Sequence, residues 1–142
     1  MELLDIYRCL GDETRQRILH LLAERPLCVC HFQTILGAPQ VAISKHLAYL
    51  RRHGLVTARR HEQWVIYQLP EPCPAELKLQ VRCLRECARS QPVFQRDLDR
   101  VKAVRQECDW VAAKVRPSKP APAAAPSVYE CHEAHCVNLV HG

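Results

Sequence analysis

The stretch that decides the fold is residues 28–54, which read CVCHFQTILGAPQVAISKHLAYLRRHG. Apolar residues recur at helical spacing on both sides of Gly37, and glycine readily ends a helix in the left-handed conformation. Pro39 follows at a position that suits the first turn of a new helix. The pattern therefore predicts two helices, over about residues 28–36 and 39–53, joined by a tight turn.

Working outward, helices are expected before this stretch and strands after it. Helical spacing of apolar residues predicts a helix over residues 3–10, then a second one that Asp12 caps and Pro26 ends. Residues 55–69 change to a two-residue period around a polar turn, which predicts a β-hairpin. Helix, helix, turn, helix and hairpin in this order give a mostly α fold with a small β-hairpin, the winged helix-turn-helix.

The chain is divided by changes in composition. Residues 1–91 are expected to form one domain for DNA binding and dimerisation, closed by a helix over 75–89. Residues 92–115 read as a helical extension. Residues 116–127 are rich in proline and alanine, which predicts an extended linker. Residues 128–142 form a tail with two cysteines and three histidines, expected to be flexible.

The charge distribution favours a nucleic-acid partner. Residues 25–61 contain no Asp or Glu, but they hold six Lys or Arg and four His. A field of one sign over such a length attracts phosphate groups. A solvated basic face that only improves solubility would show the same composition, so charge alone leaves both interpretations open.

The predicted fold favours DNA as the partner of this basic segment, because the helix after the turn enters the DNA major groove in such proteins. Residues 39–53 would read DNA, and residues 55–69 would form the wing. Val41, Leu47 and Leu50 are expected to face the core and leave polar side chains outside. The candidate DNA-binding residues are Gln40, Ser44, Lys45 and His46 on the helix, with Arg59, Arg60 and His61 on the hairpin. The alternative is a helix-turn-helix that binds protein.

Cysteine usage bears on the compartment. The chain has nine cysteines, an odd number that does not suit a disulfide framework. Its first residues include Glu2 and Asp5 and lack the apolar run of an export signal or a membrane span. We therefore expect a cytoplasmic protein with no membrane partner, whose reduced thiols can act as ligands.

Four motifs occur in order: LGDETRQRIL at 10–19, LCVC at 27–30, SKHL at 44–47 and GLV at 54–56. On these motifs the sequence resembles the ArsR/SmtB family of bacterial metal-sensing repressors, over about residues 4–70. Within that family it is similar to the arsenic-responsive branch, which carries LCVC at the start of its third helix.

This resemblance implies a transcriptional repressor that works without an organic cofactor. It implies a homodimer, paired through residues 2–9 and 75–89, that occupies double-stranded operator DNA. The dimer would leave the operator on binding trivalent arsenic or antimony, As(III) or Sb(III). The residues also argue against an enzyme, since the sequence has no phosphate-binding loop, no paired carboxylates and no resolving partner beside a reactive cysteine.

Cys28 and Cys30 are the predicted metal ligands, because soft thiolates select soft ions. On one helix their side chains would point about 200° apart, at roughly 100° per residue. We therefore expect ion binding to unwind or bend the first helical turn. Gln33 stands where the arsenic branch often has a third cysteine, so the third ligand stays open. His31 could be a ligand too, but a surface position is expected for it. Further candidates are Cys83, Cys87, Cys108, Cys131 and Cys136.

Two other functions remain open at this point. A repressor of the same fold could sense cadmium, lead or another soft ion such as copper(I). A thiol redox regulator is the second, although a disulfide between Cys28 and Cys30 would be strained. The Cys-His-x-x-His-Cys motif at 131–136 has zinc-ligand types, but its donors are too crowded for the usual tetrahedral spacing.

Overall fold

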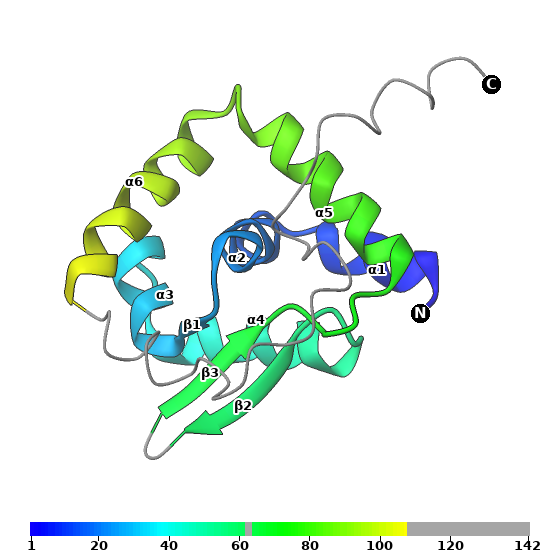
Figure 1. Ribbon diagram of the computed structural model, residues 1–142, viewed down its shortest axis with the longest axis horizontal. Coiled ribbons are helices and arrows are strands. Elements are labelled where there is room, and N and C mark those ends of the chain that lie inside the picture. The colour runs from blue at the N-terminus through cyan, green and yellow to red at the C-terminus, as the bar shows by residue number, and fades with distance from the viewer. Residues whose placement is uncertain (62–63, 108–142) are drawn as a thin grey trace, which may run out of the picture.

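The computed structural model describes residues 1–61 and 64–107, which form helices around a small antiparallel sheet. The helices are α1 (Leu3–Leu10), α2 (Glu13–Glu24), α3 (Val29–Leu36), α4 (Gln40–Arg52), α5 (Ala75–Ala88) and α6 (Pro92–Glu107). The strands are β1 (Leu27–Cys28), β2 (Thr57–His61) and β3 (Trp64–Gln68). Figure 1 shows α2 at the centre, with the other helices around it. The predicted winged helix-turn-helix is confirmed.

Helix α2 lies at the centre of the hydrophobic core. Every residue from Ile18 to Ala23 is buried, whichever side of the helix it occupies. A helix that is buried all round needs neighbours on every side, and α1, α4, α5 and α6 all contact α2. Its start is as predicted, because the Asp12 side chain accepts a hydrogen bond of 3.0 Å from the Arg15 backbone N–H.

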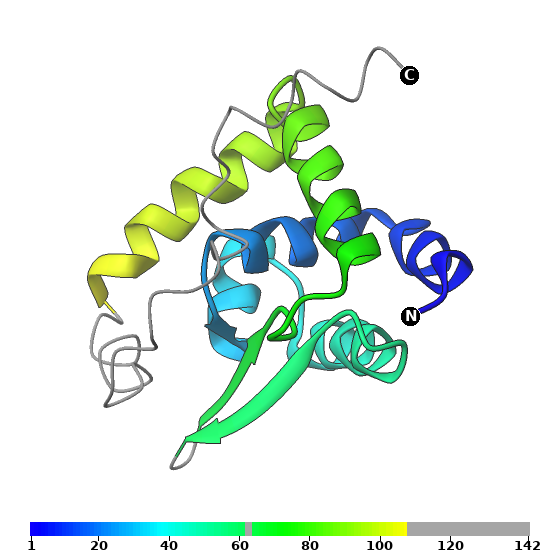
Figure 2. The ribbon, with the colours of Figure 1, turned by 45° about the vertical axis from the view of Figure 1, so that its right-hand side comes forward.

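The sheet has the strand order β1-β3-β2, with both pairings antiparallel. Strands β2 and β3 form the predicted hairpin, which projects away from the helices in Figure 2; residues 62–63 of its expected turn lie outside the described residues. Strand β1 was not predicted. Its Leu27 pairs with Tyr67 and its Cys28 with Ile66, so Cys28 belongs to the sheet rather than to the predicted helix.

The prediction that Val41 faces the core is wrong. Val41 is 66% exposed, whereas Ile43, Leu47 and Leu50 are fully buried. These three positions follow the i, i+4, i+7 spacing that lines one face of a helix. Val41 stands two residues before Ile43 and therefore points outward, on the side of α4 that carries the exposed Gln40 and Lys45.

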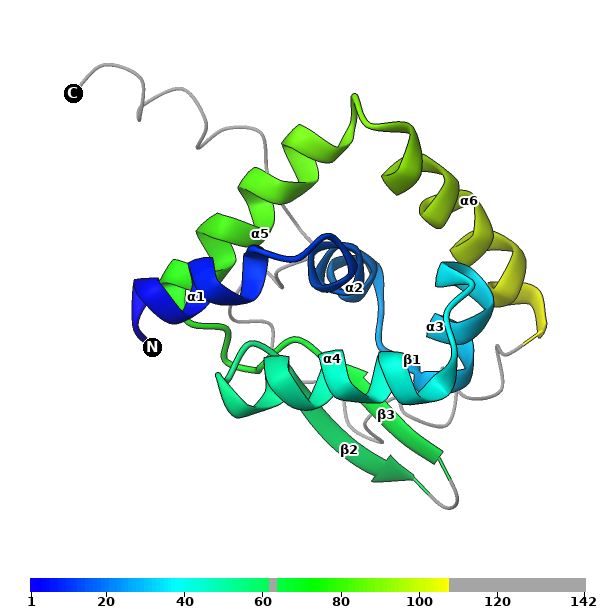
Figure 3. The same cartoon turned by 180° about the vertical axis from the view of Figure 1, so that it is seen from behind.

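The C-terminal helices close the fold. Helix α5 confirms the helix predicted over 75–89, and α6 confirms the start of the helical extension at Pro92. Helix α6 packs against both α2 and α3, as Figure 3 shows for α3. The rest of the expected extension, the linker at 116–127 and the tail at 128–142 lie outside the described residues.

A buried ion pair fastens α6 to α2. The guanidinium of Arg17 donates two hydrogen bonds to the Asp97 carboxylate, from Nε at 2.7 Å and from Nη2 at 2.8 Å. The Asp97 side chain is only 1% exposed. Arg100 also donates from Nη1 to the backbone carbonyl of Ile35 at 2.7 Å, near the end of α3. A charged pair of this kind is costly to break, because the remaining charge stays buried without a partner.

We expect Arg17→Ala to lower the free energy of unfolding by about 3–5 kcal/mol, because it strands the buried Asp97 carboxylate. Urea unfolding of the reduced protein measures the change. Arg89→Ala is the matched control, since its partner Glu86 lies 3.1 Å away on the surface, where ion pairs contribute little. Equal losses for the two variants would contradict the structural role given to the Arg17–Asp97 pair.

Candidate functional site

Cys28 lies where a strand becomes a helix. Its backbone is extended, with φ −94° and ψ 168°, and it occupies the N-cap position of α3. Cys30 is the second residue of that helix, and it is exposed. The sequence-based geometry assumed that both cysteines were helical. Because Cys28 is not, the argument that their sulfurs must point about 200° apart fails, and so does the unwinding inferred from it.

His31 completes a reciprocal cap at the start of α3. The Cys28 sulfur accepts a hydrogen bond from the His31 backbone N–H, and His31 Nδ1 accepts one of 3.3 Å from the Cys28 backbone N–H. This is the capping-box arrangement, built here with a sulfur and an imidazole. His31 is only 3% exposed, so its predicted surface position is wrong. Its Nε2 is buried and has no hydrogen-bond partner.

The two sulfurs and the imidazole form one cluster. A ligand atom from each of Cys28, Cys30 and His31 lies within 4.8 Å of the other two. Among residues 1–61 and 64–107, the structure brings no other three Cys, His, Asp or Glu side chains together in this way. The predicted pair is therefore close enough to share a soft ion. His31 completes the cluster, although the sequence analysis expected it on the surface. The signal that could have located His31 is its N3 position in α3, where a side chain can cap the backbone.

The Cys28 thiol is unusually acidic. Burial on its own would raise its pKa, but hydrogen bonds with the side chains of His31 and Cys30 and with the His31 backbone outweigh burial. Together they lower the pKa of Cys28 from 9.0 to about 7. A large fraction of Cys28 is therefore thiolate at neutral pH, the form that binds metals and metalloids.

The cluster touches the elements expected to meet DNA. Cys28 packs against Ile66 and Trp64 of strand β3, in the wing. Cys30 lies on α3, which packs against α4. A change at the two sulfurs can therefore reach both the wing and α4 through direct contacts.

The predicted DNA-binding residues fall into two groups. Gln40, Lys45, Arg59 and Arg60 are exposed on α4 and β2, whereas Ser44 and His61 are partly buried. His46 is also partly buried, and its Nδ1 lies 3.8 Å from Asp12 Oδ1 at the start of α2. His46 therefore joins α4 to α2, which leaves it less free to reach a base edge.

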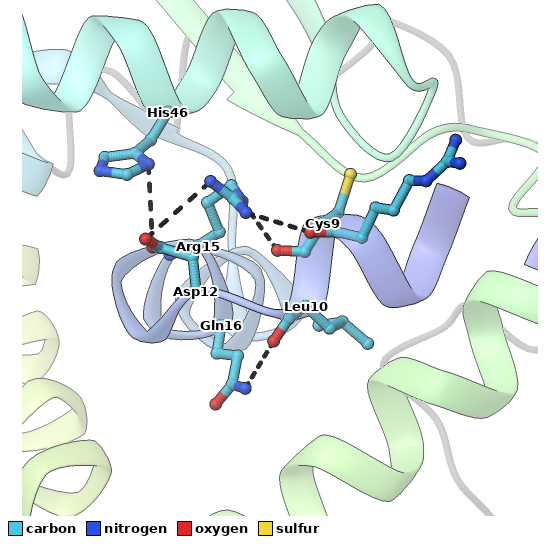
Figure 4. A network of polar contacts seen from close by, with 7 residues as sticks. Cys9, Leu10, Asp12, Arg15, Gln16 and His46 are labelled. Carbon is cyan, nitrogen blue, oxygen red and sulfur yellow. Dashed lines mark hydrogen bonds and ion pairs between the residues drawn. The ribbon is translucent and has the colours of Figure 1, made fainter. Parts of the chain in front are cut away.

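Arg15 and Gln16 take part in the same network of polar contacts at the start of α2 (Figure 4). Arg15 Nε donates to the Cys9 carbonyl at 2.8 Å, and Gln16 Nε2 donates to the Leu10 carbonyl at 2.6 Å. These bonds satisfy carbonyls at the end of α1 that have no partner within that helix. The Arg15 guanidinium also lies over the ring of Tyr49 on α4, 4.4 Å from its centroid. The 10–19 motif thus fixes α1 and α4 on α2.

Comparison with known proteins agrees with this architecture. The sequence pattern of the bacterial regulatory protein, arsR family, matches residues 12–58. The structure of HlyU from Vibrio cholerae is similar, with a TM-score of 0.55 and 33% identity, covering 59% of this chain and 88% of HlyU. The chain belongs to the ArsR family.

Two curated members of the ArsR family are similar in sequence. The arsenic resistance transcriptional regulator ArsR1 of Pseudomonas putida is 44% identical over 70 residues, which are 49% of this chain and 55% of that protein. The arsenical resistance operon repressor of Escherichia coli is 44% identical over 73 residues, 51% of this chain and 62% of that protein. The chain thus spans less than two thirds of either relative. Both are transcriptional regulators rather than enzymes.

The DNA contacts of α4 and the wing, and the ligand pair Cys28 and Cys30, stay predictions. The described part of the chain has no helix with the length and apolar character needed to cross a membrane.

We expect His31→Ala to raise the pKa of the Cys28 thiol from about 7 toward 9.0, because the hydrogen bonds and charge that lower it are weakened. At a fixed neutral pH the thiolate fraction then falls. Thiolate ultraviolet absorbance, titrated against pH and corrected with the matching Cys28→Ser protein, measures the midpoint. Gln33→Ala, on the same helix, serves as the control and should leave the midpoint unchanged. A His31→Ala midpoint still near 7 would remove His31 from this role.

Proposed function

We propose that this ArsR-family protein is a repressor that binds operator DNA as a homodimer and is released by trivalent arsenic or antimony. The observation that carries the proposal is the cluster of Cys28, Cys30 and His31, whose ligand atoms lie within 4.8 Å of one another. It stands between the wing and the helix-turn-helix. The names of the two arsenic-related relatives support the choice of ion.

The chemistry of the donors suits a soft ion. Cys28 and Cys30 would hold it through two thiolates, and soft sulfur ligands select such ions over hard ones. Cys28 loses its proton near neutral pH, so little free energy is spent on removing it when the ion binds. Cys30 is exposed, which gives an incoming ion access to the otherwise buried cluster.

Release from DNA would follow from the double role of Cys28. When its sulfur binds an ion, the cap it provides to the His31 N–H weakens, and the short β1–β3 pairing is placed under strain. That pairing holds the wing, and α3 holds α4. To change occupancy from nearly all bound to nearly all free, the ion must favour the released state by about 5.5 kcal/mol. Two or three bonds from thiolates could supply this difference.

Exposed apolar side chains support the dimer. On the outer sides of α1 and α5 the large hydrophobic residues that remain accessible are Leu3, Leu4, Tyr7 and Leu79. The two helices contact each other, and Gln80 Nε2 donates a hydrogen bond of 3.3 Å to the Tyr7 hydroxyl. Pairing of two copies through residues 2–9 and 75–89 would cover these side chains, and burial of apolar surface drives association.

DNA would be read by the exposed side of α4, with the wing on the flanking backbone. Gln40 can form a bidentate pair with adenine, and Lys45 can contact guanine or phosphate. Val41 stands beside Gln40 and is exposed, so it can contact the methyl group of thymine. Arg59 and Arg60 on β2 are placed for phosphate contacts.

A second candidate is a repressor of the same fold that senses cadmium or lead. The buried imidazole of His31 beside the two sulfurs favours it, because nitrogen is a good ligand for divalent ions of intermediate softness. Gln33, in place of a third cysteine, leaves this alternative open.

The sensing role is tested by fluorescence anisotropy of the reduced protein on DNA from its own promoter. We expect arsenite or antimonite to release the wild-type protein. Cys28→Ser and Cys30→Ser should bind DNA with unchanged affinity and stay bound, because one thiolate cannot chelate the ion. Cys73→Ser, which alters a thiol elsewhere in the chain, should behave like wild type. Release by cadmium or lead but not by arsenite would support the repressor function and contradict the assignment of arsenic as the inducing ion.

The DNA contact of Lys45 is tested by salt dependence. Each phosphate contact contributes about 0.9 to the slope of log K against log salt. Lys45→Ala in both protomers should therefore make the slope shallower by about 2 and weaken binding at low salt. Lys102→Ala removes an exposed lysine from α6 and should change neither quantity. An unchanged slope in Lys45→Ala would contradict a contact between Lys45 and a DNA phosphate.

A further inference from the structure

Helix α3 depends on contacts outside itself at both ends. It has only eight residues, and isolated helices shorter than about 12–15 residues are marginal in water. Cys28 and His31 cap its first turn. At the other end, the backbone carbonyl of Ile35 would normally accept from the N–H four residues later. That residue is Pro39, which has no N–H, so the Ile35 carbonyl needs a partner from elsewhere in the chain.

Arg100 of α6 supplies this partner. Its Nη1 donates to the Ile35 carbonyl oxygen at 2.7 Å, at the short end of the usual range for such a hydrogen bond. The guanidinium also brings a positive charge to the C-terminal end of α3, where the helix dipole favours a cation. Helices α3 and α6 pack against each other, as Figure 3 shows. Arg100 is thus a cap for α3 that comes from a different helix.

Helix α6 keeps Arg100 in place because it is itself fixed to α2. The ring of Phe94 is buried and meets the ring of His20 edge to face, with 5.1 Å between their centroids. Asp97 forms the buried ion pair with Arg17. Asp97 and Arg100 are three residues apart, so they are neighbours on the surface of α6. The guanidinium therefore extends toward α3 from a helix that cannot shift without disturbing a buried ion pair.

We propose that Arg100 is a positioning residue of the sensor. It holds the C-terminal end of α3 and thereby sets the concentration of trivalent arsenic or antimony that releases the protein from DNA. Cys30 lies on α3, and α3 packs against α4. A short helix held at one end resists the distortion that an ion causes at the other end. The effect on release rests on the proposed sensing function, whereas the effect on α3 does not.

The effect on α3 is measured without any ion, by brief digestion of the full-length reduced protein with chymotrypsin under native conditions. Phe32 is buried in α3, so cleavage after it requires α3 to open. Because a hydrogen bond from a charged group contributes about a factor of ten or more, we expect Arg100→Ala to speed this cleavage about tenfold. Cleavage after Phe94 should stay as in wild type, since the Arg17–Asp97 pair still holds α6. Mass spectrometry of the fragments measures both rates.

The effect on release is measured by fluorescence anisotropy on promoter DNA, titrated with arsenite. An ion acts by shifting the balance between two states, so a protein with a weaker α3 needs less of it. We expect Arg100→Ala to lower the arsenite concentration at half release about tenfold. Arg100→Lys keeps a cationic donor and should recover most of the wild-type value. Arg96→Ala removes an exposed arginine from the same helix and should match wild type in both measurements.

The outcomes separate this role from the sensing function. Unchanged cleavage after Phe32 in Arg100→Ala would overturn the role of Arg100. An equal rise in cleavage after Phe32 and Phe94 would overturn it too, because it would indicate general destabilisation. If arsenite releases the wild type and Arg100→Ala at the same concentration, Arg100 does not set the sensitivity. Faster cleavage after Phe32, together with a wild type that arsenite never releases, would disprove the sensing function and leave the contact of Arg100 with α3 standing.

Discussion

The extended backbone at Cys28 is the constraint on which the rest of the site depends. One residue pairs with Ile66 in the sheet, caps α3 with its sulfur, and accepts the hydrogen bond that makes its thiol acidic. If α3 began one residue earlier, Cys28 and Cys30 would diverge by about 200° and β1 would not exist. The position of the helix start therefore decides both the ligand geometry and the attachment of the wing.

A second level of organisation is the use of α2 as a hub. Its buried residues lie at the centre of the core, while Arg15, Gln16 and Arg17 fasten other elements to it. Arg15 and Gln16 hold the end of α1, and Arg15 also stacks on Tyr49 of α4 (Figure 4). Arg17 holds α6 through Asp97. Helix α4 is thus positioned by polar contacts with α2 as well as by its own apolar face.

Much of this could be predicted from the sequence, because local patterns determine it. Gly37, which adopts a φ of 65°, marked the turn, and Asp12 marked the start of α2. The LCVC motif predicts Cys28 and Cys30 as a ligand pair, and the structure brings their sulfurs within 4.8 Å of each other. Strand β1 could not be found in this way, since two residues carry no period and their pairing with β3 is a long-range contact.

The burial of polar side chains could not be predicted from the sequence either. Asp97 lies in a charged helix and reads as a surface residue until its partner, 80 residues earlier, is known. His31 reads as a surface imidazole for the same reason. The prediction that Val41 faces the core was wrong because both Val41 and Ile43 are apolar, and only packing decides which of the two faces inward.

The attachment of α6 has a consequence for the cooperativity of the fold. Its buried carboxylate belongs to an ion pair with α2, and Arg100 holds a carbonyl near the end of α3. Segments with few buried contacts open locally at low cost, whereas segments tied into the core open only with the whole domain. Helix α6 is of the second kind, so the amide protons of its buried interior residues Val101 and Val104 should exchange with solvent as slowly as those of α2.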